Sequence, residues 1–158
     1  MIFDKFKTNK AKKWNNKGNK YFRDGNYSKA MESYKKALEI NPNHKKALNN
    51  MGLALQRVNK YKESLKFFDK TLKIDPKYVV ALNGKGFSLF KLSRYDDALE
   101  FFDKTIETDP QYKYAWVNKN LALRKLERYE EANEMIIELM KSDLSYKELI
   151  NTEIEYNK

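Results

Sequence analysis

Asparagine and basic residues recur along this chain at intervals of 34 residues or a multiple of 34. One column of asparagines is Asn15, Asn49 and Asn83, and a second is Asn16, Asn50 and Asn118. A column of cations is Arg23, Arg57, Lys91 and Lys125. Because an amide both donates and accepts hydrogen bonds, asparagines in register can bind the backbone of an extended peptide without reading its side chains. The cations suit a ligand that carries acidic residues.

The residue types favour binding over catalysis. The chain has no cysteine, and His44 is its single histidine, so a metal site would need carboxylates alone and a serine nucleophile would lack a base. Asp96 and Asp97 are adjacent, but they fall at an expected helix start, where negative charge complements the helix dipole. Gly84 and Gly86 belong to a helical pattern and not to a phosphate-binding loop. We therefore expect no enzyme activity, no cofactor and no metal.

Composition narrows the fold class and the cellular location. Charged residues make up 34% of the 158, which is typical of a helical protein with much exposed surface, and five Gly and three Pro are too few for an all-β fold. No apolar run approaches the roughly 20 residues that span a bilayer, and the N-terminus lacks the apolar core of a signal peptide. The absence of cysteine fits a reducing compartment. The sequence predicts a cytoplasmic protein without a membrane partner.

Proline and glycine divide the chain into repeats. Pro42, Pro76 and Pro110 are each 34 residues apart, and Gly18, Gly52 and Gly86 keep the same interval. Apolar residues at helical spacing predict two helices in each unit. The first helices (A) are expected at 11–24, 45–58, 79–92 and 113–126, and the second helices (B) at 28–40, 62–74, 96–108 and 130–141. Asp75 and Asp109 should end their B helices, because a residue before proline is pushed out of helical geometry.

Each unit resembles the tetratricopeptide repeat (TPR), whose pattern is W-x2-L-G-x2-Y, then A-x3-F, then P. The matching residues are Trp14, Gly18, Tyr21, Ala30, Tyr34 and Pro42 in the first unit, Leu48, Gly52, Leu55, Ser64, Phe68 and Pro76 in the second, and Leu82, Gly86, Leu89, Ala98, Phe102 and Pro110 in the third. A fourth unit is degenerate, with Asn120 in place of glycine and Leu144 in place of proline. We expect looser packing there.

The resemblance implies an all-α fold, a right-handed α-α superhelix (a TPR solenoid) with three full repeats and one degenerate repeat. The expected organisation is an N-terminal extension at 1–10, repeat units at 11–44, 45–78, 79–112 and 113–144, and a C-terminal capping helix at 145–158. Ile2, Phe3 and Phe6 can extend or cover the first helix. Lys13 and Lys20 stand where later units have small residues, which indicates that no hairpin packs on the first unit and that the array is complete.

The resemblance also implies a concave groove, lined by the A helices, that binds peptides or extended segments of partner proteins. Along this face, 24 positions contain no acidic residue, although the chain has 22. The candidate groove residues are Lys12, Asn15, Asn16, Asn19, Arg23, Lys46, Asn49, Asn50, Arg57, Asn83, Phe87, Phe90, Lys91, Asn118 and Lys125. Two other readings stay open: the family favours asparagine at one of these positions, and cations in the last turn of a helix complement its dipole.

The groove is expected to be polarised. Its first two units offer cations and asparagines for an acidic part of the ligand, and its last two offer apolar residues such as Val80 and Phe87. Some TPR co-chaperones hold the terminal carboxylate of heat-shock chaperones with asparagines and cations. Asn19 and Asn50 match two of those positions, but Asn15, Val80 and Gly84 stand where the clamp has lysine or arginine, so we expect no such clamp.

Charge leaves alternatives open. The net charge is +10, and residues 1–62 carry 16 Lys and Arg against four Asp and Glu. This balance allows nucleic-acid binding as an alternative function. The sequence favours it less than peptide binding, because Trp14 and Trp116 fall at core positions and no nucleic-acid motif is present. A lysine-rich coding bias explains the excess equally well. The leading hypothesis is a non-catalytic protein-interaction scaffold, and self-association through the fourth unit or the C-terminal helix is compatible with it.

Overall fold

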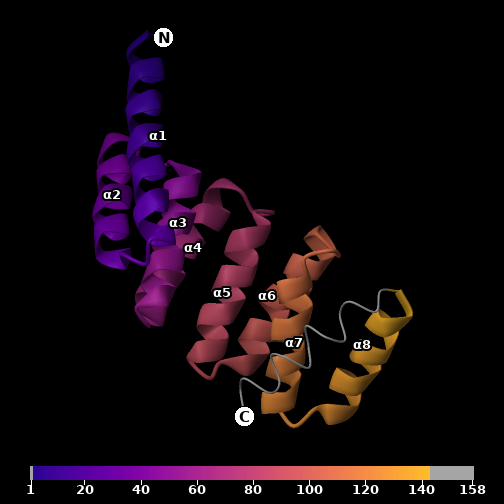
Figure 1. Cartoon of the computed structure of the whole chain (residues 1–158). Coiled ribbons are helices and arrows are strands. Elements are labelled where there is room, and N and C mark those ends of the chain that lie inside the picture. Colours follow the sequence, from indigo (N-terminus) through magenta and orange to yellow (C-terminus); the bar gives the residue numbers. More distant parts are fainter. Residues whose placement is uncertain (1, 143–158) are drawn as a thin grey trace.

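The computed structural model describes residues 2–142, and this part of the chain is formed by helices joined by short turns (Figure 1). The helices are α1 (Ile2–Arg23), α2 (Tyr27–Ile40), α3 (Lys45–Arg57), α4 (Tyr61–Ile74), α5 (Val79–Lys91), α6 (Tyr95–Thr108), α7 (Lys113–Lys125) and α8 (Tyr129–Ser142). No strand occurs in the described residues. The predicted capping helix at 145–158 and the last residues of the fourth unit lie outside them.

Apart from the start of α1, each helix begins and ends within one residue of the predicted position. The turn between the A and B helices contains a residue with positive φ at every 34th position, and these residues are Gly25, Asn59, Ser93 and Glu127. Such a left-handed residue commonly ends a helix. At the other end of each hairpin, Asp75 and Asp109 adopt extended geometry immediately before proline. The helix ends expected at Asp75 and Asp109 are therefore confirmed.

The first helix is longer than the other A helices. It begins at Ile2 and has 22 residues, whereas α3, α5 and α7 have 13 each. The expectation that the first residues extend this helix is confirmed, and in Figure 1 its N-terminal turns project beyond α2. Lys13 and Lys20 on this helix are exposed.

The hairpins stack in sequence order, and every helix packs mainly on its neighbours in the chain. Among the described residues, α1 also touches α3, α3 touches α5 and α5 touches α7, whereas no B helix touches another B helix. The array therefore curves with the A helices on its inner side (Figure 1). This curvature places the predicted binding face on the concave surface.

An aromatic ring at the centre of each of the first three hairpins holds its two helices together. Tyr34, Phe68 and Phe102 are almost completely buried. A glycine on the partner A helix faces each ring, and a Cβ atom at Gly52 would lie 2.7 Å from the Phe68 ring. The glycines at 34-residue spacing are therefore required by close approach of the helices, as the sequence predicted.

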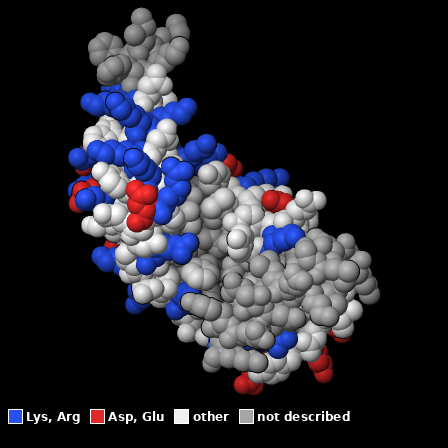
Figure 2. Space-filling view, in the orientation of Figure 1, with Lys and Arg blue, Asp and Glu red and all other residues white. Residues whose placement is uncertain are grey.

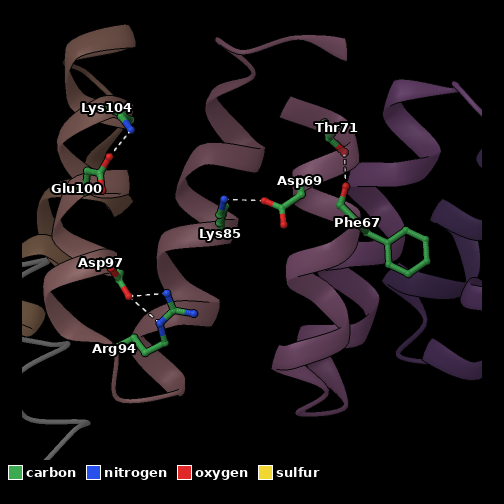
Figure 3. A network of polar contacts seen from close by, with 8 residues as sticks. All are labelled: Phe67, Asp69, Thr71, Lys85, Arg94, Asp97, Glu100 and Lys104. Atoms are coloured by element: carbon green, nitrogen blue, oxygen red, sulfur yellow. Dashed lines mark hydrogen bonds and ion pairs between the residues drawn. The ribbon is translucent and has the colours of Figure 1, made fainter. Parts of the chain in front are cut away.

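Polar contacts join one hairpin to the next. Lys85 Nζ on α5 lies 2.6 Å from Asp69 Oδ1 on α4 (Figure 3), and Lys119 Nζ on α7 lies 2.6 Å from Asp103 Oδ1 on α6, one repeat later. In the first interface the equivalent positions are Met51 and Lys35, so this ion pair cannot form there. Hydrogen bonds between asparagines of α1 and α3 join these two units, as described below.

The burial and contacts of Trp14, Trp116 and Asn120 go beyond what the sequence indicated. Trp14 and Trp116, which the sequence placed at core positions, are only partly buried, and Trp116 packs against the core cluster of Val117 and Leu139. The Trp14 ring lies beneath the ammonium groups of Lys17 and Lys36, at 5.0 and 4.5 Å. Asn120, in the glycine column, is fully buried and donates from Nδ2 to the Ala132 carbonyl at 3.0 Å. This bond links α7 to α8 in place of the close approach that glycine allows.

The single histidine, His44, is the N-cap of α3. Because histidine titrates, this cap should make stability depend on pH. His44 Nδ1 accepts a hydrogen bond from the Ala47 backbone N–H at 3.2 Å. Partial burial, opposed by a backbone hydrogen bond and assisted by Lys46, lowers the pKa of His44 below 6.5. Because the folded pKa is depressed, this contribution is complete above the unfolded pKa and is lost as the pH falls through the folded value.

The variant His44→Asn is expected to remove this pH dependence, because asparagine caps helices well and does not titrate. Wild type should lose thermal stability relative to the variant as the pH falls from about 7 to about 5. Thermal unfolding of both proteins at intermediate pH values measures the difference. Melting curves that shift in parallel across this range would rule out a capping role for the neutral imidazole.

Candidate peptide-binding groove

The six predicted groove cations are all exposed on the A helices. They are Lys12, Arg23, Lys46, Arg57, Lys91 and Lys125. Within the described residues none of them forms an ion pair, whereas Lys45, Lys85 and Lys119 do. The last-turn cations Arg57 and Lys91 lie over aromatic rings, Arg57 over Phe22 at 5.8 Å and Lys91 over Phe87 at 5.4 Å. The inner surface therefore offers positive charge that the described part of the protein does not neutralise.

Asparagines of the first two units bind one another across the unit interface. Asn50 Nδ2 on α3 donates to Asn15 Oδ1 at 3.0 Å and to Asn19 Oδ1 at 2.8 Å, both on α1. Asn19 Oδ1 also accepts from the Tyr34 hydroxyl at 3.0 Å. Burial raises the pKa of Tyr34 to about 12, so this hydroxyl remains a donor at physiological pH. The two columns of asparagines found in the sequence (Asn15, Asn49 and Asn83; Asn16, Asn50 and Asn118), which we call the asparagine ladder, therefore also hold neighbouring hairpins together.

This network decides which atoms remain for a ligand. Both hydrogens of Asn50 Nδ2 are used, and the oxygens of Asn15 and Asn19 are acceptors within the network. No acceptor among the described residues pairs with Asn15 Nδ2 or Asn19 Nδ2. Asn15 is buried, whereas Asn19 is partly exposed, so the amide nitrogen of Asn19 can donate to a carbonyl or carboxylate oxygen of a ligand.

The ladder is not uniform. Asn15 and Asn49 are only 3% exposed, and Asn49 Oδ1 is buried with no hydrogen-bond partner in the described structure. Asn16, by contrast, is exposed, while Asn19 and Asn50 are partly exposed. The ladder positions most accessible to a ligand are therefore in the column of Asn16 and Asn50.

Hydrogen bonds also join the A helices of the later units, but they are made by different residues. Asn118 Nδ2 on α7 donates to Asn83 Oδ1 on α5 at 3.1 Å. Between units two and three, Gly84 replaces asparagine, and Gln56 Nε2 instead donates to the Gly84 carbonyl and to Ser88 Oγ, both at 2.7 Å. Gly84 itself lies against Phe68, because a Cβ atom there would be 2.6 Å from the ring. The gap in the ladder thus has a packing cause.

A first cavity, which we call the polar cavity, lies between the first two units. It has a volume of about 570 Å³. Its lining residues are Asn16, Asn19, Phe22, Arg23, Tyr34, Asn50 and Leu53. Amide groups and one guanidinium dominate the polar part of this lining, and none of the described lining residues is acidic.

A second cavity, which we call the aromatic cavity, extends from the first unit to the fourth. It has a volume of about 650 Å³. Its lining residues are Phe22, Leu53, Gln56, Arg57, Asn59, Tyr61, Asn83, Phe87, Lys91, Tyr114, Val117 and Asn118. Aromatic rings and aliphatic side chains form much of its wall, with Arg57 and Lys91 as its charged residues. Here too the described lining contains no acidic residue.

Nine of the fifteen predicted groove residues line these cavities. The polar cavity brings together Asn16, Asn19, Arg23 and Asn50, and the aromatic cavity brings together Arg57, Asn83, Phe87, Lys91 and Asn118. Six line neither cavity, and they are Lys12, Asn15, Lys46, Asn49, Phe90 and Lys125. Phe90 instead packs on the Leu89–Phe102 core and lies 5.4 Å from the Tyr95 ring.

Sequence reasoning missed lining residues that come from B helices and turns. Tyr34, Asn59 and Tyr61 are among them, because only A-helix positions were assigned to the groove. One signal was present: Tyr34 stands in the column of Phe68 and Phe102, where a hydroxyl needs a polar partner. Phe22 and Leu53 lie on the assigned face and line both cavities.

The described residues were also compared with other kinds of site. No group of three or more His, Asp or Glu side chains lies close enough in residues the structure describes to hold a metal ion. None of the described helices has the length and apolar character needed to cross a membrane. The candidate site is formed by the two cavities on the inner surface.

Stacked helical hairpins with an inner, cavity-lined surface define an α-helical repeat solenoid. The sequence pattern of the tetratricopeptide repeat family matches residues 11–44, 46–78 and 79–112, more than half of the chain. The chain belongs to the tetratricopeptide repeat family, as its motif predicted. Members of this family generally serve as protein-interaction modules and not as catalysts. A comparison with curated protein sequences found no match.

Solved structures of TPR domains resemble the chain along most of its length. The first TPR of Spaghetti (RPAP3), solved with the HSP90 peptide SRMEEVD, superposes with a TM-score of 0.74 at 23% identity, over 76% of this chain and 95% of that one. The Sgt2 TPR domain from Aspergillus fumigatus gives 0.71 at 25% identity, over 77% and 82%. MamA from Desulfovibrio magneticus RS-1 gives 0.75 at 27% identity, over 89% and 81%.

Proposed function

We propose that this protein is a non-catalytic scaffold or adaptor that binds an extended, partly acidic segment of a partner protein along its inner surface. The observation that carries the proposal is the chemistry of the two cavities. Amide donors and exposed cations line them, and their described lining contains no acidic residue. An acidic segment supplies both the carbonyl oxygens that the amides need and the charge that the cations need.

Known relatives support a peptide ligand of this chemistry. The Spaghetti TPR domain was solved with SRMEEVD, a peptide rich in carboxylates. Here Asn15, Val80 and Gly84 replace three cations of the carboxylate clamp, while Asn19 and Asn50 remain. The exposed cations Arg23, Arg57 and Lys91 lie instead in the last turns of the A helices. We infer that an acidic segment is held through its side chains along the groove, without a terminal-carboxylate clamp.

The excess of lysine over the first two hairpins is the observation that keeps nucleic acid as an outcome to be tested. Figure 2 shows lysine and arginine side chains spread over the N-terminal part of the molecule, with few acidic ones among them. Exposed lysines such as Lys13, Lys35 and Lys36 line neither cavity, so this charge is not confined to the groove. A generic polyanion would therefore bind without needing the groove residues.

The proposal is tested by fluorescence anisotropy with a labelled acidic peptide, the same peptide with glutamine in place of glutamate, and a single-stranded oligonucleotide. The variant Asn16→Ala removes an exposed groove amide that has no hydrogen bond in the described structure. It is expected to weaken binding of the acidic peptide about fivefold, the value of one hydrogen bond. The control Asn9→Ala, on the same helix but lining neither groove cavity, should bind as wild type does.

The outcomes separate the two ligand classes. Preference for the acidic over the glutamine peptide, reduced in Asn16→Ala alone, supports the groove. Tight, steeply salt-dependent binding of the oligonucleotide that is equal in both variants would replace the proposal with nucleic-acid binding. Equal binding of the acidic and glutamine peptides would remove the acidic character of the ligand.

A further inference from the structure

Two residues divide the groove into neighbouring subsites. Phe22 on α1 and Leu53 on α3 line both the polar cavity and the aromatic cavity, so they form a ridge between the two. On one side of the ridge the wall carries Asn16, Asn19 and Arg23. On the other side it carries aromatic rings. A ligand that lies along the groove must cross this ridge and therefore meets two different chemistries in succession.

The aromatic cavity is built to accept an apolar side chain. The Tyr61 and Phe87 rings pack edge to face, with their centroids 6.4 Å apart, and Val117 and Leu53 add aliphatic surface. Tyr114 is 62% exposed beside them, which is unusual for a large side chain on a well-packed helix. Burying such apolar walls under a ligand side chain releases water from both surfaces.

Cations stand over the rings that form this cavity. Arg57 lies over Phe22 and Lys91 lies over Phe87, so each cation is held beside the apolar space by the ring beneath it. Neither forms an ion pair with a described residue. An apolar guest in the cavity would thus have positive charge beside it, contributed by two different helices.

The polar cavity, on the other side of the ridge, also favours an acidic group of the ligand. The amide nitrogens of Asn16 and Asn19 are its donors, because both hydrogens of Asn50 Nδ2 are used within the interface and Asn19 Oδ1 accepts hydrogen bonds there. Arg23 supplies the charge at this subsite. A carboxylate or carbonyl oxygen satisfies these groups, and a basic side chain does not.

We propose that the groove recognises a two-part motif, a bulky apolar residue seated in the aromatic cavity and flanked by acidic residues that reach Arg57, Lys91 and Arg23. This inference rests on the proposed peptide-binding function and specifies its ligand. It assigns Phe87 to specificity for the apolar residue and the three cations to its acidic neighbours. A ligand with either part alone uses one half of the site.

The test is a set of labelled peptides of sequence GEEXEEG, with each amino acid in turn at X, together with GKKFKKG. We expect peptides with Phe, Leu, Ile, Met or Trp at X to bind about tenfold or more tighter than the peptide with Ala, and GKKFKKG not to bind. Phe87→Ala should abolish the preference at X. The matched control is Phe101→Ala, a half-buried ring beneath Lys85 that lines neither cavity, and it should keep the preference.

Circular dichroism and thermal unfolding show whether each variant is folded. Arg57→Gln provides a second variant that leaves the aromatic wall in place, and it should weaken all the acidic peptides while keeping their ranking at X. Binding of acidic peptides with no preference at X overturns the two-part motif and leaves the proposed function standing. A preference that survives Phe87→Ala also overturns it. Failure of every peptide to bind overturns the proposed function together with the motif.

Discussion

The variant Phe68→Ala is expected to lower the free energy of unfolding by about 3–5 kcal/mol, the usual cost of removing a buried phenyl ring. Phe68 is 0% exposed. Its ring lies between Gly52 on α3 and Gly84 on α5, where Cβ atoms would approach to 2.7 and 2.6 Å. Since neither glycine has a side chain that can move into the space, the cavity left by the substitution cannot close.

Chemical denaturation monitored by circular dichroism measures this cost. The matched control is Phe101→Ala on α6, where the ring is only partly buried beneath Lys85 and Lys104 and should contribute less. Repeat proteins are stabilised by contacts between neighbouring units, so loss of the Phe68 ring should also weaken the contact between units two and three. A cost equal to that of the control would contradict the role assigned to the Phe68 ring.

The second large effect is expected in binding. Arg23→Glu combined with Arg57→Glu should weaken binding of an acidic peptide roughly 10- to 100-fold at low salt, because each reversal replaces an attraction worth about 0.5 kcal/mol by a repulsion of similar size. Both side chains are exposed and line the two cavities. The loss should shrink as salt is added, since exposed charges are screened.

Lys62→Glu combined with Lys66→Glu is the control for this prediction. These lysines are exposed on α4, line neither cavity and give the same change in net charge. Isothermal titration calorimetry of both double variants distinguishes the effect of direct contacts in the groove from the effect of the protein's net charge on peptide affinity. Equal weakening in the two would mean that net charge, and not the groove, attracts the peptide.

The fold was predictable because its signals are local and repeated. The positive-φ position at Gly25 recurs at Asn59, Ser93 and Glu127, so helix ends fall at the same place in every unit even where glycine is absent. The ends at Asp75 and Asp109 follow from the prolines after them. The extent of α1 was harder to predict, because no residue before position 11 carries the repeat pattern.

The site was predictable only as far as one helix face can be read alone. Asn16, Arg23 and Arg57, which the sequence placed on the predicted groove face, line the two cavities. The hydrogen bond of Asn50 to Asn19 depends on the distance between two hairpins, which no single helix specifies. For the same reason the contribution of Tyr61, which belongs to a B helix, and the contact of Gly84 with Phe68 emerged only from the packed units.

The central claim, that an acidic segment lies along the inner surface, is tested most directly by nuclear magnetic resonance. In a titration of nitrogen-15-labelled protein with an acidic peptide, the side-chain amide signals of Asn16, Asn19, Asn50 and Asn83 should shift together. The signal of Asn133, exposed on α8, should not move. Shifts confined to residues outside the two cavities, with the groove asparagines unchanged, would contradict the account.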